Sequence, residues 1–273
     1  MLIKTRCIVL HRFPYSDSSF IVKALTEERG VISFILKGGK RKDSPFKGAL
    51  DPLAESEVVF RENPQKAGGD GLLFVKEATL LNWRGHMRDD LMSQAVAQVM
   101  AEIVMRYAPP GVPLQEEFTL LSKALDDLNL GEGRAAESPD TSTSGTIDAT
   151  NPTPLANVFA QWLLDTSDLW GYHLDLSTCS RCERELDQAA ADFHPESGGL
   201  ICKACLGVET PRARIQTVQG LWSLAYGQPI GDNRVFVENA LLAYLRNHIG
   251  FLKEIHSLQW LQEIRKLCSA QTT

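Results

Sequence analysis

Two pairs of cysteines are the residues best suited to chemistry in this chain of 273 residues. Cys179 and Cys182 form one Cys-x-x-Cys pair, Cys202 and Cys205 form a second, and nineteen residues separate the pairs. Each pair places two sulfur atoms on one side of a tight turn, and two such turns together make the tetrahedral thiolate set that zinc prefers. The spacing therefore predicts one zinc ion held by these four cysteines.

Four thiolates would fill the coordination shell of the zinc ion and leave no open position for a water molecule. We therefore predict a structural zinc site, with two disulfides or free buried thiols as the alternatives. The first six residues lack the apolar stretch of a secretion signal, and no apolar run approaches the roughly 18 residues of a membrane helix. We expect a cytoplasmic protein without membrane contact, and disulfides are rare in that compartment.

A second segment with functional residues is the basic turn, which we define as residues 37–47. Its cations are Lys37, Lys40, Arg41, Lys42 and Lys47. Ammonium and guanidinium groups bind phosphates, and Gly38 and Gly39 would let the backbone approach a ligand closely. We predict that these cations contact nucleic acid, together with Arg12 just past the first expected strand. A solvated turn without a ligand is the alternative.

The distribution of charge supports a polyanion partner for the first part of the chain. Residues 1–81 hold 13 Lys and Arg against 10 Asp and Glu, whereas the whole chain has a net charge of −6. The remaining residues are therefore strongly acidic. Such asymmetry favours one region that binds a polyanion and another that meets different partners.

The elements that must position these residues change from strands to helices along the chain. The first eighty residues predict five short strands, separated by turn residues that include 14–17, 28–30 and 68–71. The expected strands are Lys4–His11, Ser19–Thr26, Val31–Lys37, Glu55–Arg61 and Leu72–Leu81. This number of strands suits a five-stranded oligonucleotide-binding (OB) barrel, with an SH3-like barrel as the alternative.

From residue 89 onward the apolar residues recur at helical spacing. The expected helices are 89–106, 114–128, 155–170, 218–226 and 234–268, the last with a break near Gly250. We predict an α+β protein with an OB domain at 1–81 and a helical domain at 82–273. The helical domain would contain a disordered insertion at 131–154 and a zinc-binding segment at 177–208.

The sequence gives no sign of an enzyme. Gly38, Gly39 and Lys40 lack the spacing of a phosphate-binding P-loop, and no nucleophile and base stand in a recognisable motif. Six histidines are scattered, and each is better explained as a surface or capped side chain than as a general base. We therefore expect no catalytic residues and no small-molecule substrate. A zinc-ribbon factor that binds nucleic acid in transcription or RNA metabolism is the alternative function.

Several short motifs resemble one known family when they are taken in order. They are Cys7–Leu10, Tyr15–Val22, Leu25–Gly30, Lys37–Arg41, the cysteine pairs, and the closing segments Leu245–Gly250 and Ile255–Leu261. Together they resemble the RecO family of bacterial recombination and repair mediators. The resemblance covers most of the chain outside residues 131–154.

The resemblance implies an N-terminal OB fold and a helical C-terminal domain that carries the zinc knuckle. It implies a protein that binds single- and double-stranded DNA, anneals complementary strands and assists RecA in displacing single-stranded DNA-binding protein (SSB). The implied partners are RecR and the C-terminal tail of SSB, and the implied location is the cytoplasm, in association with the nucleoid. The residues alone do not locate the surfaces for these partners.

Overall fold

The computed structural model describes residues 2–61, 72–109, 112–131, 154–186, 190–195, 198–206, 212–249 and 255–270. The chain divides into two compact units. Residues 1–129 with 255–273 form unit 1, and residues 130–254 form unit 2. Among the described residues, no helix combines the length and the apolar composition needed to cross a membrane.

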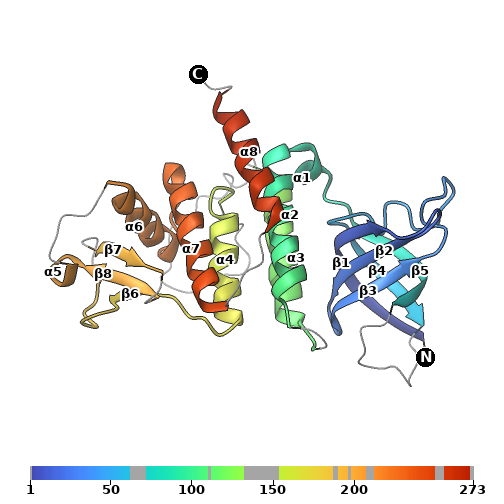
Figure 1. Cartoon of the computed structure of the whole chain (residues 1–273), viewed down its shortest axis with the longest axis horizontal. Helices are drawn as coiled ribbons and strands as arrows, with labels where there is room; N and C mark the ends of the chain where they lie inside the picture. The colour runs from blue at the N-terminus through green and yellow to red at the C-terminus, as the bar shows by residue number, and fades with distance from the viewer. Residues whose placement is uncertain are drawn as a thin grey trace, which may run out of the picture. The chain divides into compact units, whose positions relative to one another are not determined.

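Unit 1 begins with a closed barrel, drawn in blue to teal in Figure 1. Its strands are β1 (Leu2–Pro14), β2 (Phe20–Thr26), β3 (Gly30–Leu36), β4 (Glu55–Arg61) and β5 (Leu73–Asn82). The long strand β1 pairs with β2 and with β4, and β3 closes the barrel through a short parallel pairing with β5. The strand order β1-β2-β3-β5-β4 confirms the predicted OB fold.

The barrel closes because alternate residues of each strand are apolar and point inward. Phe34 and Phe60 meet edge to face at its centre, with ring centroids 5.3 Å apart, and both are buried. The side chains between the inward ones face outward and carry the polar and charged groups. The expected strands agree with the observed ones to within about three residues because this alternation is strong in the sequence.

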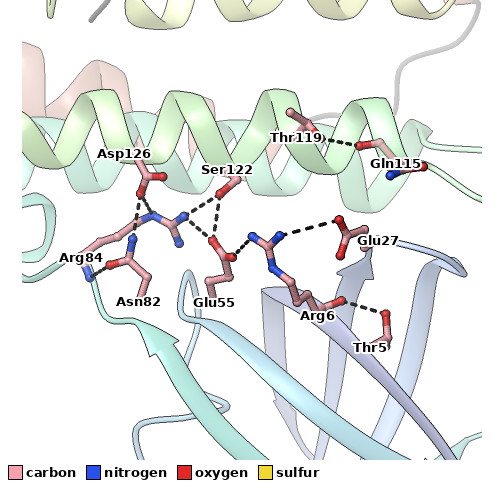
Figure 2. Close-up of polar contacts among 10 residues, drawn as sticks. All are labelled: Thr5, Arg6, Glu27, Glu55, Asn82, Arg84, Gln115, Thr119, Ser122 and Asp126. Carbon is pink, nitrogen blue, oxygen red and sulfur yellow. Dashed lines mark hydrogen bonds and ion pairs between the residues drawn. The ribbon is translucent and has the colours of Figure 1, made fainter. Parts of the chain in front are cut away.

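A buried ion network joins the barrel to a helix of the same unit (Figure 2). The Arg84 side chain is fully buried and donates from Nη2 to Glu55 Oε2 at 2.7 Å and from Nε to Asp126 Oδ1 at 2.8 Å. The second oxygen of Glu55 accepts from Arg6 Nη2 at 2.5 Å, and Ser122 also donates to Glu55. Because Glu55 belongs to β4 and Asp126 to a helix, the network fixes that helix on the barrel.

The helices of unit 1 come from two separate stretches of the chain, residues 85–130 and 256–270. They are α1 (Gly85–Asp89), α2 (Leu91–Tyr107), α3 (Gln115–Leu130) and α8 (His256–Ala270). Helix α8 packs along α2, where Glu102 accepts hydrogen bonds from the backbone N–H groups of His256 and Ser257 at 3.2 and 2.8 Å. This carboxylate from α2 caps the first turn of α8.

The compact units divide the chain differently from the predicted domains at 1–81 and 82–273. Residues 85–129 and 255–270 pack with the barrel because the Arg84 network and the α2–α8 contact tie them to it. The division into an OB domain at 1–81 and a helical domain at 82–273 stays a prediction. The predicted break near Gly250 is confirmed, since α7 ends at Ile249 and α8 begins at His256.

Within the described residues, unit 2 combines four α-helices with a small sheet. Its elements are α4 (Val158–Leu169), β6 (Asp175–Cys179), β7 (Ala190–His194), β8 (Gly199–Cys202), α5 (Lys203–Leu206), α6 (Arg212–Ala225), the 3-10 turn η2 (Gly231–Asn233) and α7 (Arg234–Ile249). Strand β8 is central, parallel to β6 and antiparallel to β7. The predicted insertion lies outside the described residues except at its two ends, 131 and 154, and so does the expected turn at 68–71.

Candidate metal site and nucleic-acid interface

The small sheet of unit 2 brings the two cysteine pairs together. Cys179 ends β6 and Cys202 ends β8, and these strands are paired, with Cys179 opposite Leu200. Cys182 and Cys205 follow within the next turns. All four sulfur atoms lie within 4.8 Å of one another, and those of Cys182 and Cys202 are 3.8 Å apart. A tetrahedron with metal–sulfur bonds of about 2.3 Å has edges of about 3.8 Å, so the four thiols fit one metal ion.

The hydrogen bonds within the cluster also suit a cation. Burial opposes ionisation of Cys179, but the backbone N–H groups of Cys202, Arg181 and Cys182 donate toward its sulfur and lower its pKa to about 6. Cys205 shares hydrogen bonds with the sulfurs of Cys202 and Cys182, which raises its pKa to about 12. One thiolate therefore forms readily, whereas full ionisation of the cluster needs a bound cation in place of the protons.

Backbone hydrogen bonds hold the turn that contains Cys179 and Cys182, and this turn lies close to Gly199. Ser180 donates its N–H to the carbonyl of Leu200 at 2.9 Å, and Glu183 donates to the carbonyl of Cys179 at 2.8 Å. A side chain at Gly199 would place its Cβ 2.8 Å from that of Ser180, so only glycine fits there. This contact explains why residue 199, in the Gly198–Gly199 pair before the second pair of cysteines, is glycine.

Among the described residues, the surroundings of the cysteines carry charges of both signs. Arg181, Arg184 and Lys203 are exposed there, and Glu183 and Glu185 are exposed beside them. His194 lies close to Asp192, with Nε2 to Oδ2 at 3.3 Å, and is not part of the group of four metal-binding side chains. The metal site is therefore a tetrathiolate cluster with a mixed surface.

The basic turn of unit 1 connects β3 to β4 and is held by its own backbone. Gly38 adopts a left-handed φ of +73°, and Lys40 donates its N–H to the carbonyl of Ser18 at 3.1 Å. Gly39 has a packing role, since an added Cβ would lie 3.1 Å from the Phe20 ring. The two glycines thus shape the turn and let it pack on the barrel.

All five cations of the basic turn are exposed. Within the described residues, Arg41, Lys42 and Lys47 have no carboxylate partner. Lys40 donates to the carbonyl of Ser16 and lies 5.6 Å from the centre of the Phe20 ring. The turn therefore presents a group of positive charges that Asp43, also exposed, offsets only in part.

Arg12 differs from the other predicted phosphate contacts. Its guanidinium group pairs with Asp51 and lies 4.5 Å from the centre of the Phe20 ring. The carboxylate of Asp51 neutralises much of its charge, although its side chain stays 30% exposed. Contact of Arg12 with DNA stays a prediction. It would require that the Arg12–Asp51 ion pair open or that a phosphate share the guanidinium group with Asp51.

Phe46 in the basic turn and Tyr15 after β1 could stack on bases, and they have different environments. Phe46 packs against the barrel core, whereas Tyr15 is 57% exposed beside the β1–β2 turn. Two other aromatic residues, Phe20 and Phe74, lie next to the cations of the basic turn. The sequence reasoning missed both because they are single aromatic residues within apolar strands.

The comparisons with known proteins agree with this architecture. A closed OB barrel with an exposed basic turn is an architecture suited to binding nucleic acid. The family model described as "Recombination protein O N terminal" matches residues 1–83. Residues 1–83 are therefore similar to the N-terminal domain of the RecO family.

Curated relatives match the chain over nearly its whole length. The DNA repair protein RecO of Geobacter metallireducens is 27% identical, with 92% of this chain and 97% of the relative covered. The protein of the same name from Anaeromyxobacter sp. strain K is 26% identical over 98% of this chain and 99% of the relative. That of Syntrophobacter fumaroxidans is also 26% identical, over 95% of this chain.

Proposed function

We propose that this protein is a non-enzymatic mediator of recombination and repair. It binds single- and double-stranded DNA, anneals complementary strands and, with RecR, assists the loading of RecA onto DNA covered by SSB. The observation that carries this proposal is the exposed basic turn on an OB barrel that is similar to the N-terminal domain of the RecO family.

The physics of annealing explains why such a turn is useful. Two complementary strands repel each other because each is a polyanion, so a protein that joins them must neutralise phosphates without reading the bases. Lys40, Arg41 and Lys42 provide charge at the end of long side chains, and among the described residues no carboxylate holds them in one orientation. This arrangement favours binding that tolerates any sequence.

We propose that the ion held by the four cysteines is zinc and that its role is structural. Four sulfur ligands are typical of structural zinc, and they leave no coordination position for a substrate. The small sheet also has an apolar layer, since Phe193, Leu200 and Ile201 are buried and β7 packs against α6. The metal would lock the two knuckles at the edge of this layer.

Unit 2 offers a surface for the acidic and apolar C-terminal tail of SSB. The ring of Trp222 on α6 lies 4.5 Å from that of Tyr226, which directly follows the helix and is 56% exposed. Ile215 on the same helix is 41% exposed, and Arg246 on α7 is exposed as well. Arg214 is committed to Asp192, with Nη1 to Oδ2 at 2.5 Å, so it contributes less to this surface.

A strand-annealing assay tests the proposed function most broadly. Two complementary labelled oligonucleotides are mixed with the protein, with and without SSB, and duplex formation is followed by energy transfer. We expect acceleration in both cases and weak dependence on sequence. Failure to anneal, together with no affinity for an SSB tail peptide, would contradict the mediator function. Selective binding of one duplex or RNA sequence would instead support a zinc-ribbon factor.

A further inference from the structure

The outer surface of the barrel carries a row of residues that the proposed function does not yet use. The strand register places Leu2 of β1 opposite Arg61 of β4, Arg61 opposite Phe74 of β5, and Phe74 beside Ile35 of β3. Directly opposed residues lie on the same face of a sheet. These four side chains therefore form one row across four strands, which we call the Phe74 row.

The Phe74 row is unusually apolar for an outer surface. Phe74 is 46% exposed and Leu2 is 61% exposed, while Ile35 is only 8% exposed and forms the floor beside the ring. The inward neighbours of Phe74 on the same strand, Leu73 and Val75, already pack on the barrel core. The Phe74 ring is therefore not needed to fill the core, and half of it stays available to a ligand.

Cations surround the ring. The Nζ atom of Lys37 lies 4.9 Å from the ring centroid, and Arg61 is directly opposite Phe74 in the neighbouring strand. Lys76 is exposed two residues further along β5, at an irregularity in the β4–β5 pairing. Within the part of the chain that the structure describes, neither Arg61 nor Lys76 has a carboxylate partner. A half-exposed aromatic ring thus has one cation at 4.9 Å, a second directly opposite in the strand register and a third two residues along its own strand.

We propose that the Phe74 row is a stacking site for an unpaired base of single-stranded nucleic acid. The base would lie against the Phe74 ring, and Lys37, Arg61 and Lys76 would meet the phosphates on either side of it. Aromatic rings among cations are the usual means of holding single strands without reading sequence. This inference rests on the proposed DNA-binding function and adds a site that binds single-stranded but not double-stranded nucleic acid.

The same geometry disfavours a duplex as the occupant of the row. In a duplex the faces of the bases are covered by their neighbours, so only an unpaired base offers a face to a protein ring. The basic turn acts through charge and would bind both forms of DNA. Lys37 belongs to the turn and also lies at the ring, so a single strand held by the turn continues onto the Phe74 row.

The test compares Phe74→Ala and Phe74→Leu with the wild-type protein on three ligands of equal length. The ligands are an oligonucleotide of dT, an abasic strand with the same phosphates, and a duplex. Loss of one stacked base corresponds to about a 5- to 150-fold loss of affinity. We expect such a loss on the dT strand for both variants, with the abasic strand and the duplex bound as by the wild type. The variant Phe74→Trp should restore the affinity for dT.

The control is Leu81→Ala, because Leu81 lies on the same strand and is 50% exposed but does not belong to the Phe74 row. It should leave all three affinities unchanged, and a thermal melt checks that each variant is folded. An unchanged dT affinity in folded Phe74→Ala, or an equal loss on all three ligands, would overturn the stacking site alone. If the wild-type protein binds none of the ligands, the proposed function fails as well.

Discussion

The cysteine cluster and the basic turn are built in opposite ways. In the cluster, four sulfur atoms lie within 4.8 Å of one another and turn toward a common centre. In the basic turn, five charged side chains point outward, and Arg41, Lys42 and Lys47 have no carboxylate partner among the described residues. Four sulfur ligands that share one metal ion would stabilise the fold, whereas exposed cations without a carboxylate partner can bind a polyanion.

The largest effect should follow from breaking the cysteine cluster. The double substitution Cys182→Ser and Cys205→Ser removes two of four ligands, so metal binding and the folding energy coupled to it should be lost. We expect a large fall in the melting temperature of unit 2 and loss of bound zinc, measured by calorimetry and elemental analysis. The control is Cys268→Ser, since Cys268 is exposed and lies outside the cluster.

A second possible result of this experiment would contradict a structural role of the cysteine cluster. If the double variant kept its stability but lost DNA binding, the cysteines would hold an interface and not a fold. Chelation of the wild-type protein under reducing conditions should reproduce the effect of the double variant.

The barrel that presents the basic turn depends on the Arg84 network. Replacing Arg84 by Met leaves Glu55 and Asp126 without their shared partner, and breaking a buried ion pair costs about 3–5 kcal/mol. Denaturant unfolding of unit 1 should show this loss. The matched control is Lys4→Met, which removes an exposed pair with Glu57 and should cost less than about 1 kcal/mol. Equal costs for both variants would contradict a supporting role for the network.

The stability of unit 1 at low pH also tests the Arg84 network. Burial tends to raise the pKa of Glu55, but hydrogen bonds from Arg6, Arg84 and Ser122 outweigh it and hold the pKa below the ordinary 4.5. A depressed folded-state pKa gives stability that is present above the unfolded pKa and lost as the pH falls through the folded one. We expect unit 1 to lose stability below about pH 4.5. The variant Glu55→Gln should be less stable at neutral pH and should show a flatter acid dependence.

The smallest of these effects concerns helix α8. Glu102 caps its first turn, and removal of a capping side chain costs about 1 kcal/mol. Glu102→Ala should therefore speed hydrogen exchange in the first turn of α8 with little change elsewhere in unit 1. The control is Glu263→Ala, because Glu263 is exposed on the same helix. Unchanged exchange at residues 256–259 would show that α8 is held by its packing on α2 alone.

The sequence predicted those parts of the molecule that local patterns determine. The barrel strands follow from alternating apolar residues, and the metal cluster follows from two short cysteine spacings. The strands β6, β7 and β8 were missed because they have at most five residues each and lie among turns. The Arg84 network was not predictable, since it joins residues 55, 84 and 126 through the fold. The return of α8 to unit 1 is likewise a long-range contact without a local signal.

The proposed DNA interface was only partly predictable for the same reason. The charges of the basic turn are visible in the sequence, but the pairing of Arg12 with Asp51 depends on how two distant segments meet. The exposed position of Phe74 depends on the register of β4 and β5. A single aromatic residue in a strand gives no sign of which face it occupies until that register is known.

The central claim is that the basic turn, and not the cysteine cluster, meets DNA through charge. The most direct measurement is the salt dependence of duplex binding, followed by fluorescence anisotropy, for the wild type and for the variant Lys40→Ala, Arg41→Ala, Lys42→Ala. Each lost phosphate contact lowers the slope of log K against log salt by about 0.9, so we predict a fall of about 2–3 in this variant. The double cysteine variant should keep the wild-type slope below its melting temperature. An unchanged slope in the triple variant, or a reduced slope in the folded cysteine variant, would contradict the account.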